Sequence, residues 1–104
     1  MQIVFQEEYL SSLYNEQTAD RKHWFQPEVV KKYIKVVNIL KMARGIEDLY
    51  PFHSLNYEKL VGDKAGIESV RVTDKYRLEF QTKEVGDDVI VTVCNILELS
   101  NHYQ

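Results

Sequence analysis

Two arginines, Arg71 and Arg77, are the side chains in this chain best suited to holding a phosphate group. They lie in the segment Gly62–Phe80, GDKAGIESVRVTDKYRLEF. Apolar residues alternate with them along the chain, namely Val70, Val72, Leu78 and Phe80. Successive side chains of a strand point to opposite faces of a sheet, so if the apolar residues share the core, both arginines stand on the other face. The spacing therefore predicts a hairpin that presents two guanidinium groups side by side, with its turn at residues 73–75.

Neighbouring guanidinium groups repel each other, so a sheet that holds two of them together usually supplies an anion. Glu79 lies two residues after Arg77, on the same face of the expected strand, and satisfies only part of that demand. A second interpretation is equally open at this point. Charged residues that alternate with apolar ones are also the ordinary pattern of a hairpin whose outer face is solvated.

Length and composition limit the kind of protein this is. The chain has 104 residues, of which 44% are hydrophobic, and this predicts one domain over residues 1–104 with a core that needs no metal or disulfide. Its one cysteine, Cys94, sits in an apolar run and is expected to be a buried small side chain. No apolar stretch approaches the roughly 20 residues of a membrane span, and the first ten residues carry acids where a signal peptide carries bases. We therefore expect a cytoplasmic protein with no membrane contact.

The net charge is −3, but the charges are unevenly distributed. Residues 21–44 hold seven of the 13 basic residues and a single acid, Glu28, whereas residues 1–20 and 84–104 hold acids and no Lys or Arg. Such a distribution predicts a basic patch on an otherwise acidic molecule. It favours a locally steered contact with an anion over general binding to duplex DNA.

Hydrophobic periodicity indicates the elements that position these groups. Strands are expected at residues 2–5, on either side of the 73–75 turn, and at 89–99, with a strand or loop at 54–61; helices are expected at 6–16 and from Pro27 to about Gly45, with a short turn of helix at 46–50. The run 89–99 has apolar residues at both odd and even positions, which predicts a central strand covered on both faces. The order predicts one α+β domain in which an N-terminal strand and two helices pack on a mostly antiparallel sheet of four or five strands.

The segment LNYEKLVGDKAGIESVRVTDKYRLEF, followed by a hydrophobic strand and a C-terminus in SNHY, resembles the HigB-type toxins of the RelE/ParE superfamily. Those toxins carry a stretch like L-x-G-D-[KR]-x-G-x-x-S-[IV]-R-[IV]-x-D-x-[YW]-R. The matching residues here are Leu60, Gly62, Asp63, Lys64, Gly66, Ser69, Val70, Arg71, Val72, Asp74, Tyr76 and Arg77. The resemblance covers about residues 46–104 by motif and implies a RelE-like fold.

The resemblance also implies a function: the toxin of a two-gene, type II toxin–antitoxin pair that cleaves messenger RNA on a translating ribosome. The implied partners are a cognate antitoxin encoded by a neighbouring gene, the ribosome and mRNA. Cleavage by attack of the ribose 2′-hydroxyl on the adjacent phosphate needs groups that move protons and cations that take up charge, and no metal or cofactor. Two alternatives remain, a non-enzymatic ParE-like toxin that binds DNA gyrase and an inactive interaction domain of the same fold.

The same resemblance assigns candidate roles. Arg77 matches the arginine that stabilises the phosphate, and Arg71 matches an adjacent arginine common in the motif. Many relatives end in Asp-Tyr-His, where this chain has Ser100, Asn101 and then His102, followed by Tyr103. His102 is therefore the candidate general acid or base, and Asn101 and Tyr103 are candidates for contacting the substrate.

Further candidates lie outside the tail. Glu58 stands where relatives often have a histidine and is a candidate base, and the candidate substrate-binding cations are Lys59, Lys64, Lys31, Lys32 and Lys35. The last three lie on the polar side of the second helix, where they form either a surface for ribosomal RNA or a solvated face. His23 and His53 are expected to be packing or loop residues without a catalytic role.

Overall fold

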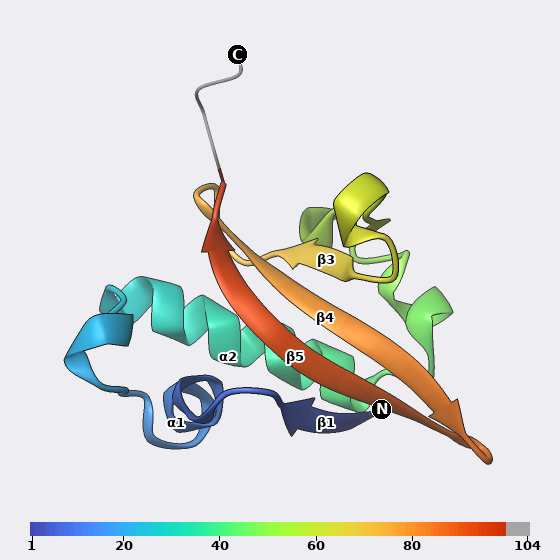
Figure 1. The fold of residues 1–104 in the computed structure, drawn as a ribbon, viewed down its shortest axis with the longest axis horizontal. Coiled ribbons are helices and arrows are strands. Elements are labelled where there is room, and N and C mark those ends of the chain that lie inside the picture. Colours follow the sequence, from blue (N-terminus) through green and yellow to red (C-terminus); the bar gives the residue numbers. More distant parts are fainter. Residues whose placement is uncertain (100–104) are drawn as a thin grey trace.

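The computed structural model describes residues 1–99, which form a five-stranded sheet with two α-helices (Figure 1). The elements are β1 (Gln2–Phe5), α1 (Glu8–Glu16), α2 (Pro27–Met42), β2 (Glu58–Lys59), β3 (Glu68–Arg71), β4 (Tyr76–Val85) and β5 (Asp88–Glu98). The strand order is β1-β5-β4-β3-β2; β1 runs parallel to β5, and the other neighbours are antiparallel. The predicted α+β class, with its mostly antiparallel sheet, is confirmed.

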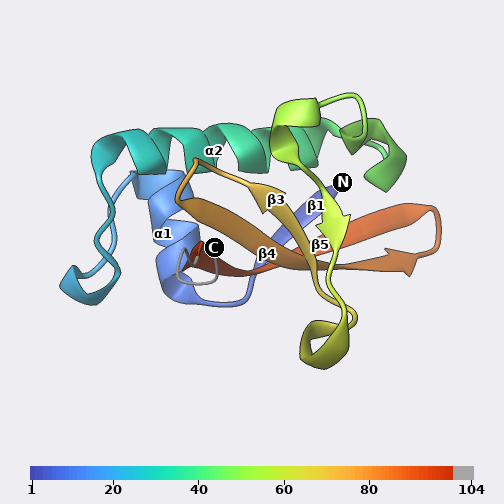
Figure 2. The ribbon, with the colours of Figure 1, turned by 90° about the horizontal axis from the view of Figure 1, so that it is seen from above.

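Both helices lie on one face of the sheet (Figure 2). The core between the two layers contains side chains from α1 (Leu10, Leu13), from α2 (Val30, Tyr33, Val36, Val37, Leu40) and from the strands (Val70, Leu78, Phe80, Val91, Val93). The Tyr33 hydroxyl, buried in this core, donates a hydrogen bond to the Leu10 carbonyl at 2.7 Å and so ties the helices together. Within residues 1–99 neither α-helix covers the opposite face of the sheet, which we call the helix-free face; the short 3₁₀ turn Gly62–Lys64 lies on that side.

The β3–β4 hairpin is closed by a turn built on Thr73. The backbone N–H groups of Val72 and Thr73 donate to the Tyr76 carbonyl, and the Thr73 hydroxyl oxygen accepts from the backbone N–H groups of Lys75 and Tyr76 at 3.1 and 3.2 Å. A threonine that satisfies two turn amides in this way is a common turn device. It fixes the register of the two strands.

The prediction that the last strand is covered on both faces was wrong. Val91, Val93 and Ile96 of β5 are buried against the helices, whereas Ile90 and Leu97 on the other face are only partly covered. A β-bulge explains the misleading pattern: Glu79 pairs with Asn95 and Phe80 pairs with Val93, so one extra residue of β5 lies between them. The bulge reverses the alternation halfway along the strand, and apolar residues of both parities therefore reach one core.

The helix boundaries differ from the expected ones by a few residues. Helix α1 begins at Glu8, and α2 ends at Met42 instead of continuing to Gly45. After α2 the Arg44 backbone N–H donates to the Asp48 carboxylate at 2.9 Å, which turns the chain away into the 3₁₀ turn Ile46–Leu49. None of the helices within residues 1–99 is long and apolar enough to cross a membrane.

Candidate functional site

Arg71 and Arg77 lie directly opposite each other on β3 and β4. Their neighbours Val70 and Leu78 are fully buried under the helices, so the two arginines project from the helix-free face of the sheet. Cβ atoms of directly opposed residues in an antiparallel pair are roughly 5 Å apart, so the two arginine side chains start close together on this face. The predicted juxtaposition of the two arginines is confirmed.

Glu79 links this pair to a third cation. Its carboxylate, only 3% exposed, accepts a hydrogen bond from Arg77 Nη2 at 2.8 Å and from Lys64 Nζ at 2.9 and 3.2 Å. Lys64 comes from the 3₁₀ turn Gly62–Lys64, so the turn of the Gly-Asp-Lys motif is held against β4 through this carboxylate. Lys64 is thereby placed on the face that carries the arginines.

The guanidinium of Arg77 keeps an unused donor. Its Nε is buried and has no hydrogen-bond partner within residues 1–99, while Nη2 is engaged by Glu79. A buried donor without a partner is costly in a finished core, and such groups are concentrated at functional sites. Among the described residues, Arg71 has no ion-pair partner and its side chain is exposed. One arginine is therefore held in place, and the other is free to meet an anion.

The pairing of the short edge strand β2 puts two of the sequence-predicted residues, Glu58 and Lys59, on opposite faces of the sheet. Glu58 pairs with Ser69 and Lys59 pairs with Glu68. Ser69 also pairs with Glu79, so Glu58 shares the face of the arginines, whereas Glu68 points into the core side, where it accepts hydrogen bonds from Tyr57 and Thr82. Residues paired across strands share a face, and Lys59 therefore lies on the side opposite to Glu58. The structure brings Glu58 to the arginine face and does not bring Lys59 there.

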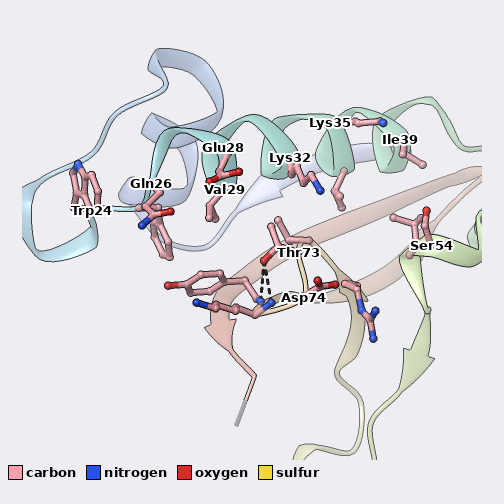
Figure 3. A pocket seen from close by; sticks show the side chains of 17 residues that line it. Trp24, Gln26, Glu28, Val29, Lys32, Lys35, Ile39, Ser54, Thr73 and Asp74 are labelled. Carbon is pink, nitrogen blue, oxygen red and sulfur yellow. Dashed lines mark hydrogen bonds between the residues drawn. The ribbon is translucent and has the colours of Figure 1, made fainter. Parts of the chain in front are cut away.

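A groove of about 820 Å³ runs between α2 and the β3–β4 turn (Figure 3). We call it the α2–hairpin groove. Its lining residues are Trp24–Gln26, Glu28, Val29, Lys32, Lys35, Val36 and Ile39 on the helix side, with Ser54, Leu55 and the hairpin residues Arg71–Tyr76 opposite. Figure 3 shows Trp24 at one end, Ser54 toward the other, and Thr73 and Asp74 facing the helix between them.

The three predicted lysines of α2 are all exposed, but they do not form one surface. Lys32 and Lys35 line the α2–hairpin groove together with Arg71, whereas Lys31 borders a smaller hollow on the other side of the helix. Residues one apart on a helix point in directions about 100° apart, which explains the separation of Lys31 from Lys32. The prediction that the lysines lie opposite the core face is confirmed, and their grouping as one patch needs this correction.

Two residues of this region, Trp24 and Lys75, were not among the sequence-based candidates, whereas Glu79, expected to offset part of the arginine charge, binds Lys64 as well. Trp24, 69% exposed, and Lys75 both line the groove, and the buried Glu79 organises the cations on the other side of β4. Trp24 is held near the hairpin because its neighbour Phe25 packs edge-on against Tyr76, with ring centroids 5.5 Å apart. A tryptophan directly before a basic helix was visible in the sequence, but its exposure was not.

Two of the three histidines, His23 and His53, lie within the residues that the structure describes. His23 stacks on Tyr9 with ring centroids 3.8 Å apart and contacts Asp20 at 2.9 Å; this contact lowers the pKa of the Asp20 carboxyl. His53 is exposed in a 3₁₀ turn. His23 is thus a packing residue and His53 a turn residue, as the sequence predicted. The predicted site residues Asn101, His102 and Tyr103 lie outside the described residues.

Two titratable side chains near the site, Cys94 and Tyr57, have a raised pKa. Burial, and then the charge of Glu79, raise the pKa of the Cys94 thiol. Burial, together with the hydrogen bond to Glu68, raises the pKa of the Tyr57 hydroxyl. Within residues 1–99 no group of three or more His, Cys, Asp or Glu side chains could hold a metal ion. The site as described is therefore a set of cations around one buried carboxylate.

Residues 3–95 match the model of a protein family described as the RelE-like toxin of the type II toxin–antitoxin system HigB. A family match over so much of the chain shows that the chain belongs to the HigB-like toxin family, as its motif predicted. It is a toxin of a type II toxin–antitoxin system. Comparison with curated proteins gives no match.

Solved structures with a similar fold come from the same superfamily. One is a YoeB/ParE toxin from Agrobacterium tumefaciens, 19% identical, with a TM-score of 0.61 over 96% of this chain and 100% of that one. Another is a YoeB–YefM complex from Staphylococcus aureus, 17% identical, with a TM-score of 0.54 over 97% of this chain and 98% of that one. At this identity the similarity shows the fold alone.

Proposed function

We propose that this toxin is a ribosome-dependent endoribonuclease that cleaves translated mRNA by metal-independent attack of a ribose 2′-hydroxyl. The observation that carries the proposal is the direct opposition of Arg71 and Arg77 on the helix-free face, with Glu58 placed on the same face through Ser69. Two guanidinium groups on one face of neighbouring strands suit a phosphate whose charge rises in the transition state. The RelE-like family generally acts by RNA cleavage, which agrees with this chemistry.

In the proposed reaction, a base takes the proton of the 2′-hydroxyl while its oxygen attacks the adjacent phosphorus. The bond to the 5′-oxygen of the next nucleotide breaks, an acid protonates that oxygen, and a 2′,3′-cyclic phosphate remains. Arg71 and Arg77 take up the charge of the phosphorane. Glu58 is the candidate base and His102 the candidate acid, with the two roles exchangeable between them. Lys64, Asn101 and Tyr103 are candidate substrate contacts.

Affinity for the ribosome is assigned to a different surface. Lys32 and Lys35 are exposed beside Arg71, and Lys31 is exposed farther round the helix. Contacts of lysines with RNA phosphates add binding without sequence information. The proposed partners are therefore the ribosome, mRNA and, for neutralisation, the cognate antitoxin encoded by a neighbouring gene, with the cytoplasm as the place of action.

Mapping cleaved messages after induction tests the proposal. Codon-phased cuts are expected from the parent, and Arg77→Ala should lower the cleavage rate by roughly 10²-fold or more with ribosome binding retained. His102→Ala should lower it by roughly 10²- to 10⁴-fold if the imidazole transfers a proton. Parental rates in both variants would overturn the nuclease mechanism. Intact messages with DNA damage would indicate a gyrase-binding toxin, and no effect on growth would indicate an inactive interaction domain.

A further inference from the structure

A row of polar residues crosses the helix-free face beside the two arginines. Glu58 on β2 pairs with Ser69 on β3, Ser69 pairs with Glu79 on β4, and Glu79 pairs with Asn95 on β5. Residues paired across strands share a face, so the whole row lies on the face that carries the arginines. Glu58 is the candidate base and Glu79 holds two cations, but the mechanism gives Asn95 no part.

A β-bulge is what brings Asn95 to this face. Val93 of β5 is buried in the core, and in a regular strand the residue two positions later points to the same side. Here Phe80 pairs with Val93 while Glu79 pairs with Asn95, so Cys94 is the extra residue and Asn95 turns away from the core. Bulges next to active sites often redirect a side chain in this way.

Asn95 and Glu58 flank the arginine pair from opposite sides. The direct partner of Arg77 on β5 is Leu97, so Asn95 is the diagonal neighbour of Arg77. Glu58 stands in the same diagonal relation to Arg71 on the side of β2. Diagonal neighbours in an antiparallel sheet are roughly 7–8 Å apart, a distance that long side chains and a bound nucleotide can bridge.

The amide of Asn95 has hydrogen-bonding capacity to offer. Its side chain is partly exposed, and within residues 1–99 it makes no hydrogen bond. An asparagine carries a carbonyl acceptor and an NH₂ donor side by side. This arrangement matches the adjacent donor and acceptor groups on the edge of a nucleobase.

We propose that Asn95 is a specificity residue that hydrogen-bonds the base of the nucleotide directly 3′ of the cut. The proposal rests on the proposed nuclease function with Glu58 as the base. The attacked 2′-hydroxyl belongs to the nucleotide 5′ of the scissile phosphate and lies on the side of β2, so the next nucleotide lies on the side of β5. The RNA therefore crosses the strands, from Glu58 past the arginines to Asn95.

A base suits this position better than a second phosphate does. Asn95 is uncharged, and the nearest cations, Arg77 and Lys64, are already bound to the carboxylate of Glu79. Phosphate contacts would also carry no sequence information, whereas an amide that meets a base edge discriminates between bases. Asn95 thus adds a preference for one base to a site whose other residues handle charge.

Relative cleavage rates test this contact. Purified toxin is given ribosomes that carry four messages, identical except for the base directly 3′ of the cut, and primer extension measures the rate at that phosphate. The factor by which Asn95→Ala slows cleavage should differ between the best and the worst base by roughly 5- to 100-fold. The ribosome is the same in every assay, so the comparison of variant with parent isolates the contribution of Asn95.

An aspartate at the same position predicts the direction of the change. Asn95→Asp keeps the shape of the side chain but leaves only acceptors. Uracil is the only one of the four bases without an amino group, so its rate relative to the other three should fall by about tenfold in this variant. Thermal unfolding checks that both variants remain folded.

Two controls separate base recognition from a structural effect. Gln81 is exposed on the same face, opposite Thr92 and farther from the arginines, so Gln81→Ala should leave the base dependence unchanged within about twofold. On a message with an abasic nucleotide 3′ of the cut, Asn95→Ala and the parent should cleave at rates within about twofold of each other, because the proposed partner is missing.

The other outcomes each overturn the proposal. Asn95→Ala that slows all four messages and the abasic one by the same factor would give Asn95 a structural role in the bulge. Dependence on the base 5′ of the cut would mean that the RNA lies in the reverse direction, and a changed base dependence in Gln81→Ala alone would mean that it runs along the strands. A parent that cleaves none of the messages would overturn the nuclease function itself, and the role of Asn95 with it.

Discussion

The buried carboxylate of Glu79 is the most sensitive single point of the site, and replacing it by glutamine tests why it is there. Glutamine keeps the shape of the side chain but removes the charge that two cations share. Its amide oxygen can still accept one hydrogen bond, while the NH₂ group faces Arg77 or Lys64 as a second donor. We expect Glu79→Gln to lower stability and to release the Arg77 side chain.

The magnitude follows from the exposure of each partner. Arg77 is 26% exposed, and a charge-assisted hydrogen bond in such a place contributes roughly 1.5–3 kcal/mol. Lys64 is 45% exposed, so solvent screens its pair and leaves about 0–1 kcal/mol. Arg71 and Arg77 then face each other without compensation, which costs up to about 1 kcal/mol. Since glutamine retains part of the hydrogen bonding, the expected loss is about 1–3 kcal/mol, or roughly 5–15 °C in Tm for a domain of this size.

Urea and thermal unfolding measure this loss, with Glu84→Gln as the control. Glu84 lies on the same strand, β4, but is exposed, and its replacement should change stability by less than about 0.5 kcal/mol. The difference between Glu79→Gln and the parent should persist at about 0.5 M salt, because salt screens partly buried pairs far less than exposed ones. In NMR spectra the Nε–H of Arg77, buried in the parent, should exchange faster with water in the variant. Equal stability of the two glutamine variants, with unchanged exchange at Arg77, would refute the reasoning.

Three further predictions follow from other parts of the molecule. Replacing Lys31, Lys32 and Lys35 together by Ala should keep the fold and reduce the salt dependence of ribosome binding by about one unit of slope per lost phosphate contact, and an unchanged slope in filter binding would mean that the face is only solvated. Burial raises the pKa of the Tyr33 hydroxyl, so the stability that the neutral hydroxyl contributes is complete below the unfolded tyrosine pKa of about 10 and is lost as the pH rises above it. Tyr33→Phe should therefore lose less stability at alkaline pH than the parent does in urea titrations. Parallel plots of stability against pH for the two proteins would contradict this. Thr82→Val removes the hydroxyl that donates to Glu68 at 2.7 Å and should cost about 1–2 kcal/mol in the same assay, whereas an unchanged midpoint would show that water replaces the hydroxyl.

The fold was largely predictable because local signals agreed with one another. The apolar stripe of α2, the turn residues of the hairpin and the alternation around Arg71 all pointed to the elements that the structure contains. The failures have physical causes that leave no mark in a single sequence. The β-bulge in β5 made one buried face look like two, and the hydrogen bond from Arg44 to Asp48 ended α2 before the glycine that seemed to cap it.

The candidate site was predictable in its cations and much less so in their arrangement. Strand periodicity was enough to oppose Arg71 and Arg77, because period-2 alternation fixes faces once the core residues are known. The positions of the other candidates depend on pairing between segments that are far apart in the sequence. Only the register of β2 shows that Glu58 joins the arginines and Lys59 does not, and only the folded turn brings Lys64 to Glu79.

The proposed mechanism assigns chemistry and RNA binding to two different groups of charged residues. On the helix-free face, Arg77 and Lys64 share the carboxylate of Glu79, and Glu58 adds a second negative charge, so three cations including Arg71 leave a net charge of only +1. Under the proposed mechanism, such a cluster orients a phosphate but attracts a polyanion only weakly. Under the proposed mechanism, the longer-range attraction for RNA therefore comes from the exposed lysines of α2, Lys31, Lys32 and Lys35.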